Sequence, residues 1–246
     1  MDKFNYKFYV NSISNTYTVK LDKQFWVNQL GEGWTSKLRD TLRDPYMEKL
    51  MTFLQTEYAL NTVYPKKKNL FRAFKACPFE KVKIVILGQD PYYNGDANGL
   101  AFGNDDCAAF TSKSLLKIFN IIERDYYDGL CLDFDFSLEN WADQGILMLN
   151  TALTVRKNKP GSHTKQWKKF TSAVLQSLND YAPGTVFILW GGHAKAFAPH
   201  LNENMHILTS EHPAYAVRQG NRDWNCTNFK EANKILKEKY GQVVYW

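Results

Sequence analysis

The sequence lacks the signals of several protein classes. Its four cysteines, at positions 77, 107, 131 and 226, are far apart and form no Cys-x-x-Cys pair, so neither a metal site, an iron–sulfur cluster nor a disulfide framework is predicted. No apolar run approaches the length of a membrane span, and the N-terminus MDKFNYKFYV has no signal-peptide core and no Arg-rich transit character. We therefore expect a cytoplasmic protein that does not associate with membranes, with a nuclear or viral-factory location if the source is eukaryotic or viral. The sequon Asn225-Cys226-Thr227 is then a chance match.

Repeats and low-complexity linkers are also missing. The 246 residues are 44% hydrophobic and 15% aromatic, which are values typical of a globular protein with a full core. We predict an N-terminal extension over residues 1–24 and one domain over residues 25–246. The net charge of +6 favours a polyanionic partner only weakly, because many soluble proteins are as basic.

Short apolar runs alternate with helical patterns along most of the chain. The runs lie at residues 82–87, 146–149, 186–190 and 205–208, and the helical patterns at residues 112–126, 167–181 and 228–240. Residues 25–60 read as mostly helical with a break near Asp44-Pro45, and residues 70–74 as a short helix. Strands that alternate with helices predict an α/β fold: a central four-stranded parallel sheet flanked by helices on both faces, in a single domain.

Each predicted strand ends in residues that can carry chemistry. The four ends read Gly88-Gln89-Asp90, Asn150-Thr151, Gly191-Gly192-His193 and Ser210-Glu211-His212-Pro213. Because parallel strands end at one edge of a sheet, these groups are expected to line a single cleft. Each also has an ordinary interpretation: Asp90 as a helix cap, Asn150 as a turn or cap residue, and His212 as a hydrogen-bonded loop histidine. Their occurrence together favours a ligand site.

Four segments carry a resemblance to a known family. GQDPYYNGDANGLAFG, WADQGILMLNTALTVR, VFILWGGHAKAF and His212-Pro213 occur in the order and at the spacing of the family 1 uracil-DNA glycosylases. The chain resembles this family from about Val63 to its C-terminus, and more weakly upstream to Phe25. The resemblance implies a monomeric enzyme that hydrolyses the bond between uracil and deoxyribose in single- or double-stranded DNA, without a metal or cofactor. It also implies a protein inhibitor that mimics uracil or DNA as a further partner.

The resemblance assigns a role to each residue of the cleft. Asp90 matches the carboxylate that positions the attacking water and stabilises the cationic sugar, and His212 matches the histidine that donates a hydrogen bond to uracil O2. The substrate-binding residues follow from the same match: Asn150 reads the uracil edge, Phe102 stacks on the base, Tyr92 excludes the 5-methyl group of thymine, and Gln89 lines the pocket beside the water.

The DNA-binding segments depart from the family pattern. Gly191 and Gly192 match the backbone turn that contacts phosphate. The proline-rich loop of the family is replaced by residues 111–114, which keep Ser114, and Tyr93 stands where the family usually has histidine.

The largest departure follows His212. Ala216 falls where the family has a leucine that wedges into the base stack. We predict that Tyr215 takes over this role and that Arg218 contacts DNA. The alternatives are Val217 as the wedge, a packing role for Tyr215, or no strong wedge at all. Further basic residues could bind phosphate or simply lie in solvent: Arg156, Lys157, Lys159, Lys165 and Arg222.

Two function classes stay open at this stage. The first is an active uracil-DNA glycosylase. The second is a DNA-binding or processivity module on the same fold whose glycosylase activity is weak or lost, which the altered wedge segment motivates. The complete set of pocket residues favours the enzyme. A third class, an unrelated phosphate-handling hydrolase, is disfavoured because the sequence shows no P-loop, metal-ligand or nucleophile motif.

Overall fold

A computed structural model gives the architecture of the chain. It describes residues 9–10, 17–18, 20–105, 112–130, 133–220 and 223–246. Near the N-terminus, β1 (Tyr9–Val10) and β2 (Tyr17–Thr18) pair in antiparallel fashion. The domain boundary predicted after residue 24 falls inside the first helix, α1 (Lys23–Leu30). Among the described residues, no helix combines the length and apolar character needed to cross a bilayer.

The centre of the fold is a four-stranded parallel sheet. It contains β4 (Ile84–Gly88), β5 (Ile146–Asn150), β7 (Val186–Trp190) and β8 (His206–Ser210) in the order β5-β4-β7-β8. All residues of β4, β5 and β7 are buried, which explains their unbroken aliphatic and aromatic sequences, whereas β8 is an exposed edge strand. The predicted sheet is confirmed, with strand limits within about two residues of the apolar runs.

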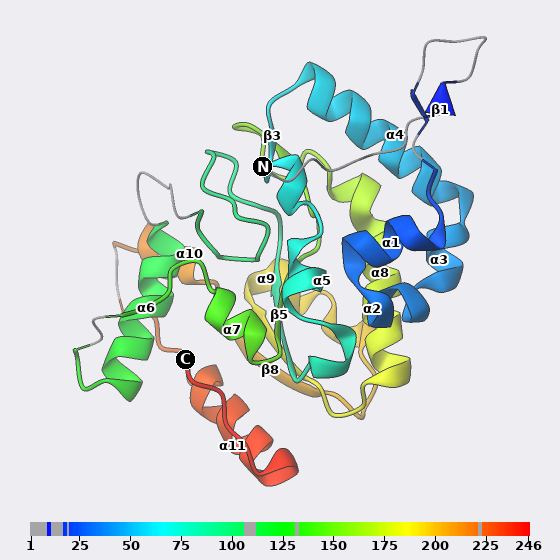
Figure 1. The fold of residues 1–246 in the computed structure, drawn as a ribbon. Coiled ribbons are helices and arrows are strands. Elements are labelled where there is room, and N and C mark those ends of the chain that lie inside the picture. Colours follow the sequence, from blue (N-terminus) through cyan, green and yellow to red (C-terminus); the bar gives the residue numbers. More distant parts are fainter. Residues whose placement is uncertain (1–8, 11–16, 19, 106–111, 131–132, 221–222) are drawn as a thin grey trace.

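Helices cover both faces of this sheet. Figure 1 shows α1, α2 (Glu32–Lys37), α3 (Arg39–Arg43), α4 (Pro45–Leu60) and α8 (Thr164–Tyr181) on one side, and α6 (Lys113–Tyr126) and α10 (Pro213–Arg218) on the other. The last helix, α11 (Asn228–Tyr240), contacts β7 and β8. The break predicted at Asp44-Pro45 is present, because Asp44 caps α4 and Pro45 begins it. The chain also breaks at Gly31, which has a φ of 87°, and at Leu38.

Several short elements connect these layers. They are β3 (Val63–Tyr64), which pairs antiparallel with β6 (Val155–Arg156), the helices α5 (Arg72–Ala76), α7 (Glu139–Asp143) and α9 (Gly191–Lys195), and the 3₁₀ turns Lys67–Asn69, Phe79–Lys81 and Ala198–His200. The β3–β6 pair was not predicted, since a strand of two residues is too short to show a periodic pattern.

One hydrophobic core joins the elements from Trp26 to Trp246. Four of its tryptophans, Trp34, Trp141, Trp167 and Trp190, are among the largest fully buried side chains. Trp190 ends β7 and packs edge-on against Trp224 and Phe102. The core therefore extends directly to the sheet edge at which the predicted site residues lie.

Candidate functional site

The carboxyl ends of the parallel strands form one edge of the sheet. The register pairs Gly88 with Asn150 across β4 and β5, and Trp190 with Ser210 across β7 and β8. A cavity of about 240 Å³ lies at this edge, and its lining includes Gly88, Gln89, Gly191, His193, His212 and Arg218. Residues from three strand ends therefore meet in one cavity, as expected for an open parallel sheet.

Asp90 lies two residues beyond β4 and is fixed by a distant loop. Its Oδ2 accepts a hydrogen bond from the Gly161 N–H at 2.5 Å. Burial raises the pKa of the Asp90 carboxyl, while the Gly161 bond and the nearby His193 act in the opposite direction. The helix-cap interpretation of Asp90 is wrong, because the next helix along the chain, α6, begins only at Lys113 and is capped by Ser112.

His212 is the N-cap residue of α10. Its Nδ1 accepts a hydrogen bond from the Ala214 N–H at 3.1 Å. Burial, together with Arg218 and His193, lowers the pKa of His212 to about 4. The ring is therefore neutral at pH 7. Because Nδ1 is an acceptor, its single proton lies on Nε2, which is a hydrogen-bond donor available to a ligand.

Two glycines give the site side chains their space. Asn150 ends β5 with only 5% of its surface exposed, and a Cβ on Gly88 would collide with its Oδ1. A Cβ on Gly191 would lie 2.7 Å from the Cβ of His212, and Gly191 has a φ of 78° that L residues rarely adopt. Gly88, at the end of β4, and Gly191, directly after β7, therefore leave the space that Asn150 and His212 occupy.

Phe102 is held in a strained backbone conformation. Its φ is 64°, which costs free energy for a residue with a bulky side chain and is found mainly where surrounding bonds enforce it. The ring centroid lies 5.7 Å from that of His212 and 5.3 Å from that of Trp190. Tyr92 donates its hydroxyl hydrogen to the Phe102 carbonyl at 2.9 Å and accepts one from the Ser112 hydroxyl at 2.5 Å. Both aromatic side chains are thus fixed before any ligand binds.

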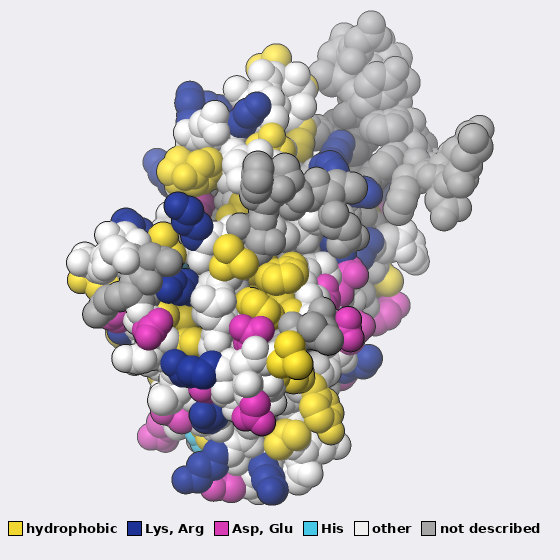
Figure 2. All heavy atoms as spheres, turned by 90° about the vertical axis from the view of Figure 1, so that its left-hand side faces the viewer, with side chains coloured by type: hydrophobic (Ala, Val, Ile, Leu, Met, Phe, Trp, Pro, Cys, Tyr) yellow, Lys and Arg dark blue, Asp and Glu magenta, His cyan; other side chains and the backbone are white. Residues whose placement is uncertain are grey.

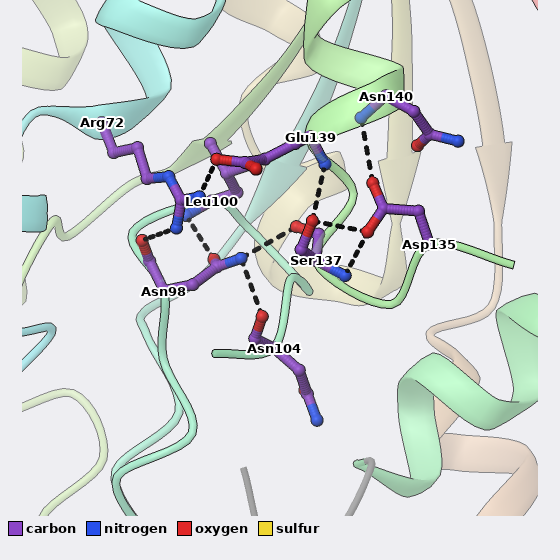
Figure 3. A network of polar contacts seen from close by, with 8 residues as sticks. All are labelled: Arg72, Asn98, Leu100, Asn104, Asp135, Ser137, Glu139 and Asn140. Atoms are coloured by element: carbon purple, nitrogen blue, oxygen red, sulfur yellow. Dashed lines mark hydrogen bonds and ion pairs between the residues drawn. The ribbon is translucent and has the colours of Figure 1, made fainter. Parts of the chain in front are cut away.

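The side chain of Asn98 forms hydrogen bonds to three backbone groups around the turn that contains Phe102 (Figure 3). This amide is fully buried, and its Oδ1 accepts the Leu100 N–H at 2.9 Å. Both hydrogens of Nδ2 are used, one on the Asn104 carbonyl at 3.0 Å and one on the Ser137 carbonyl at 2.8 Å. The turn is therefore closed on either side of Phe102 by one side chain.

A second layer of polar contacts fixes the partners of Asn98. Asp135 Oδ1 accepts hydrogen bonds from the Ser137 N–H at 2.9 Å and from the Ser137 hydroxyl at 2.5 Å. Arg72 donates to the Asn98 carbonyl at 3.0 Å and forms an ion pair with Glu139. Figure 3 shows these residues converging from α5, the Phe102 turn and the segment that leads into α7.

The predicted DNA-binding residues lie on three helices, α6, α9 and α10. The segment after His212 is not a loop, because Pro213–Arg218 forms α10. Ala216 is completely buried against the core, whereas Tyr215 is 38% exposed and Arg218 is also exposed. Gly191 and Gly192 open α9, and Ser114 lies half-buried in the first turn of α6. Ala216 therefore cannot reach a bound strand without unpacking the helix.

Basic residues do not gather into one patch on the face that contains α6 and α10. Figure 2 shows Lys and Arg side chains scattered among hydrophobic and acidic ones there. Arg156, considered above as a phosphate contact, instead forms an ion pair with the buried Glu57. Lys157, Lys159 and Lys165 are exposed, and Arg222 lies outside the described residues. Charge density alone therefore gives little information about the path of a nucleic acid.

Known proteins resemble this chain along most of its length. A family model described as Uracil DNA glycosylase superfamily matches residues 74–237. The uracil-DNA glycosylase of Chlamydia felis is 38% identical over 232 residues, which cover 92% of this chain and 99% of the relative. The chain belongs to the uracil DNA glycosylase superfamily. A second member, the uracil-DNA glycosylase of Flavobacterium johnsoniae, is 38% identical over 221 residues, which cover 99% of that relative.

Solved structures of uracil-DNA glycosylases share the fold. The mimivirus enzyme superposes with a TM-score of 0.75 at 25% identity, covering 87% of this chain and 86% of its own. A tyrosine-to-leucine variant of the mimivirus enzyme, in complex with UGI, gives the same TM-score at 25% identity and covers 87% of each chain.

His193 was expected at a strand end, but no role was predicted for it. Thr151 donates its hydroxyl hydrogen to the Gln89 carbonyl at 2.8 Å, so it must accept from His193 Nε2, which lies 2.8 Å away. Burial lowers the pKa of His193 and so favours the neutral ring, and the bond to Thr151 places its proton on Nε2. The exposed Gln89 thus has its backbone fixed from β5. In this member of the superfamily, His193 connects the ends of β4, β5 and β7.

Gly161 and Ser112 were also missed. Gly161 acts through its backbone N–H and Ser112 through a hydroxyl that caps α6 while donating to Tyr92. Neither role has a signature in the sequence, because both depend on which distant segment lies alongside.

Proposed function

We propose that this chain is a uracil-DNA glycosylase that hydrolyses the N-glycosidic bond of deoxyuridine in DNA, releasing free uracil and leaving an abasic site. The observation that carries the proposal is the state of His212: a neutral ring whose proton lies on Nε2, at the sheet edge that also carries the half-buried carboxylate of Asp90. A site with one preorganised donor and one carboxylate suits the departure of an anionic base from a cationic sugar.

His212 stabilises the leaving group. Uracil departs as an anion, and a neutral imidazole can donate its Nε2 hydrogen to the developing charge on O2 without losing its proton. Preorganised donors of this kind contribute ~2.7–4 kcal/mol each to the transition state. The base must first be flipped out of the duplex, which costs a few kcal/mol. Stacking on Phe102 returns ~1–3 kcal/mol of that cost.

Asp90 acts on the sugar side of the bond that is broken. As the bond lengthens, the sugar acquires oxocarbenium character, which an ionised carboxylate stabilises while it orients a water molecule for attack. The Gly161 N–H favours the ionised form of Asp90 against the effect of burial. The hydrogen bond at 2.5 Å also restricts the carboxylate to one orientation.

Two rigid groups supply base specificity. Tyr92 is bonded at its hydroxyl to Phe102 and Ser112, so it can act as a fixed wall beside C5 of the base. Such a wall excludes thymine better than a soft pocket, in which one methyl group is worth only ~1–3 kcal/mol. Asn150 presents an amide at the end of β5, with a donor and an acceptor that match the uracil edge and reject the amino group of cytosine.

Finer assignments rest on the resemblance. We infer that the chain is a family 1 enzyme that acts as a monomer, because the pocket residues match that family one by one. The mimivirus variant in complex with UGI supports a similar protein inhibitor as a partner here. Tyr215 is proposed as the wedge and Ser114, Gly191, Gly192 and Arg218 as phosphate contacts, since they lie exposed or half-exposed on α10, α6 and α9. The processivity-module alternative is disfavoured because the chain keeps every residue that the family match assigns to the pocket.

The test is release of uracil from a uracil-containing oligonucleotide in EDTA. We expect free uracil by mass spectrometry and an abasic strand that breaks only after alkaline treatment. No described lysine lines the cavity to act as a lyase nucleophile. Activity that requires a divalent ion, or direct strand cleavage, would contradict the proposal.

A further inference from the structure

The loop between β6 and α8 supports the segment that carries Asp90. Gly161 donates its N–H to Asp90 Oδ2 at 2.5 Å, and Asn158 donates its N–H to the carbonyl of Tyr93 at 3.1 Å. The segment from Asp90 to Tyr93 contains no helix or strand of its own. The position of the carboxylate therefore depends on the position of residues 157–162, here called the support loop.

Both ends of the support loop are tied to one buried carboxylate. Glu57, on α4, is only 4% exposed. It accepts hydrogen bonds from Arg156 Nε and Nη2, each at 2.5 Å, and from His163 Nε2 at 3.0 Å. Arg156 immediately precedes the loop and His163 immediately follows it. Because a bidentate arginine–carboxylate pair is geometrically specific, Glu57 fixes the separation and direction of the two loop ends.

His163 is also fixed from its other side. Its Nδ1 lies 2.8 Å from Thr154 Oγ1, which accepts a hydrogen bond from Trp167 Nε1 at 2.7 Å. Since the ionised Glu57 carboxylate can only accept, the ring proton of the neutral histidine lies on Nε2, and the Thr154 hydroxyl donates its hydrogen to the unprotonated Nδ1. Burial lowers the pKa of His163, and the hydrogen bond from Arg156 lowers the pKa of Glu57. The cluster therefore consists of a neutral ring, an anion and a cation.

We propose that Glu57 is a positioning residue, which holds the support loop so that the Gly161 N–H stabilises the ionised form of Asp90. The inference rests on the proposed function, because it is in that reaction that Asp90 must be ionised. Glu57 is not among the residues that line the cavity, so it acts through the support loop, whose direct contact with the carboxylate is the Gly161 N–H. Of the described groups, those that influence the charge of Asp90 directly are the Gly161 N–H and His193 on α9.

The decisive test is the pH dependence of the Glu57→Gln variant. Glutamine retains the side-chain shape but cannot hold both loop ends as a charged acceptor. Losing one N–H donor raises the pKa of Asp90, so the acid limb of the single-turnover rate moves to higher pH, by about one unit. Simple loss of a negative charge would move the limb in the opposite direction, because removing an anion favours ionisation of a nearby carboxyl. An upward shift therefore distinguishes positioning from general electrostatics.

Matched variants complete the experiment. Glu48→Gln removes an exposed carboxylate from the same helix and should leave the acid limb unchanged. Ser162→Ala removes the acceptor of the Arg156 N–H, a 2.9 Å bond inside the loop, without touching the buried charges. Ser162→Ala should shift the acid limb of the rate in the same direction by a smaller amount. It replaces Glu57→Gln in the test if circular dichroism shows that Glu57→Gln is unfolded. An unchanged or lowered limb in the folded variants overturns the proposal.

A measurement without turnover separates this inference from the proposed function. The pKa of Asp90 can be followed directly by ¹³C NMR of its carboxyl carbon in the wild-type protein and in Glu57→Gln. A raised value in the variant supports the support-loop role even if the wild type releases no uracil, a result that would overturn only the proposed function. An equal value in both proteins overturns the role of Glu57 even if the enzyme is fully active.

Discussion

The pocket and the helix that follows His212 are built in different ways. Around Phe102 and Asp90 the chain has little regular structure, yet side chains such as Asn98 are buried and bonded to distant backbone groups. Helix α10 is regular but short, and it carries the exposed Tyr215 and Arg218. The pocket around Phe102 and Asp90 is therefore rigid, as recognition of a base requires. Helix α10, here called the rim, is exposed, as contact with a DNA strand requires. Changes in the pocket should impair chemistry on every substrate, and changes on α10 only on substrates that need strand opening.

The largest effects are expected from the two groups that we propose act at opposite ends of the broken bond. Asp90→Asn and His212→Ala should each lower the single-turnover rate by about 100-fold or more, the scale of one lost preorganised group. Binding of uracil-containing DNA should persist, because neither side chain supplies phosphate contacts. Rates near that of the wild type for a folded variant, on single-stranded and duplex DNA alike, would remove that residue from the mechanism.

The next effect tests whether Asn98 acts through Phe102. Asn98→Ala removes three hydrogen bonds around the strained turn, so Phe102 should relax from its positive φ and stack less well. We expect roughly tenfold weaker inhibition by free uracil, equivalent to part of one stacking contact. Asn94→Ala, an exposed change in the same segment, is the control. Equal uracil affinity in the two variants would argue that the turn holds its shape without Asn98.

Selectivity provides a third test of pocket rigidity. Tyr92→Ala removes the wall beside C5 and should allow slow release of thymine, whereas Tyr92→Phe retains the ring and should not. Mass spectrometry of the released bases distinguishes the two results. Strict uracil selectivity in an active Tyr92→Ala variant would refute the steric account.

The smallest effect is predicted on α10, and it should depend on the substrate. Tyr215→Ala should lower activity on duplex DNA by roughly tenfold and on single strands much less, because only the duplex has a stack to open. Tyr215→Phe should retain activity on both. An equal loss of activity on duplex and single-stranded DNA would favour a packing role for Tyr215. It would also contradict the expectation that changes on α10 affect only substrates that need strand opening.

The sequence predicted which side chains stand at the strand ends and little of what holds them. The four strands were predictable because each is a short aliphatic run, and Asp90, Asn150 and His212 followed from the ends of those runs. The helical nature of residues 213–218 was missed, since six residues are too few to show a clear period.

The supporting contacts were not predictable for a different reason. Glu57 and His163 are 106 positions apart, and Asn98 and Ser137 are 39 apart. Such pairs meet only once the sheet is assembled, and the Gly161 donor is a backbone group that every residue except proline possesses. Local pattern therefore indicates the reacting groups, while the tertiary fold determines the groups that orient them.

The fit of Gly88 against Asn150, and of Gly191 against His212, has a consequence for variation at these positions. Neither glycine has a functional group, yet each is the space that a neighbouring side chain fills. In a saturation-mutagenesis screen, every replacement at Gly88 would introduce a carbon where the Asn150 amide lies. Such a screen should therefore find that these two positions tolerate substitution as poorly as the residues beside them. Selection for activity would conserve glycine there as strictly as it conserves the functional side chains.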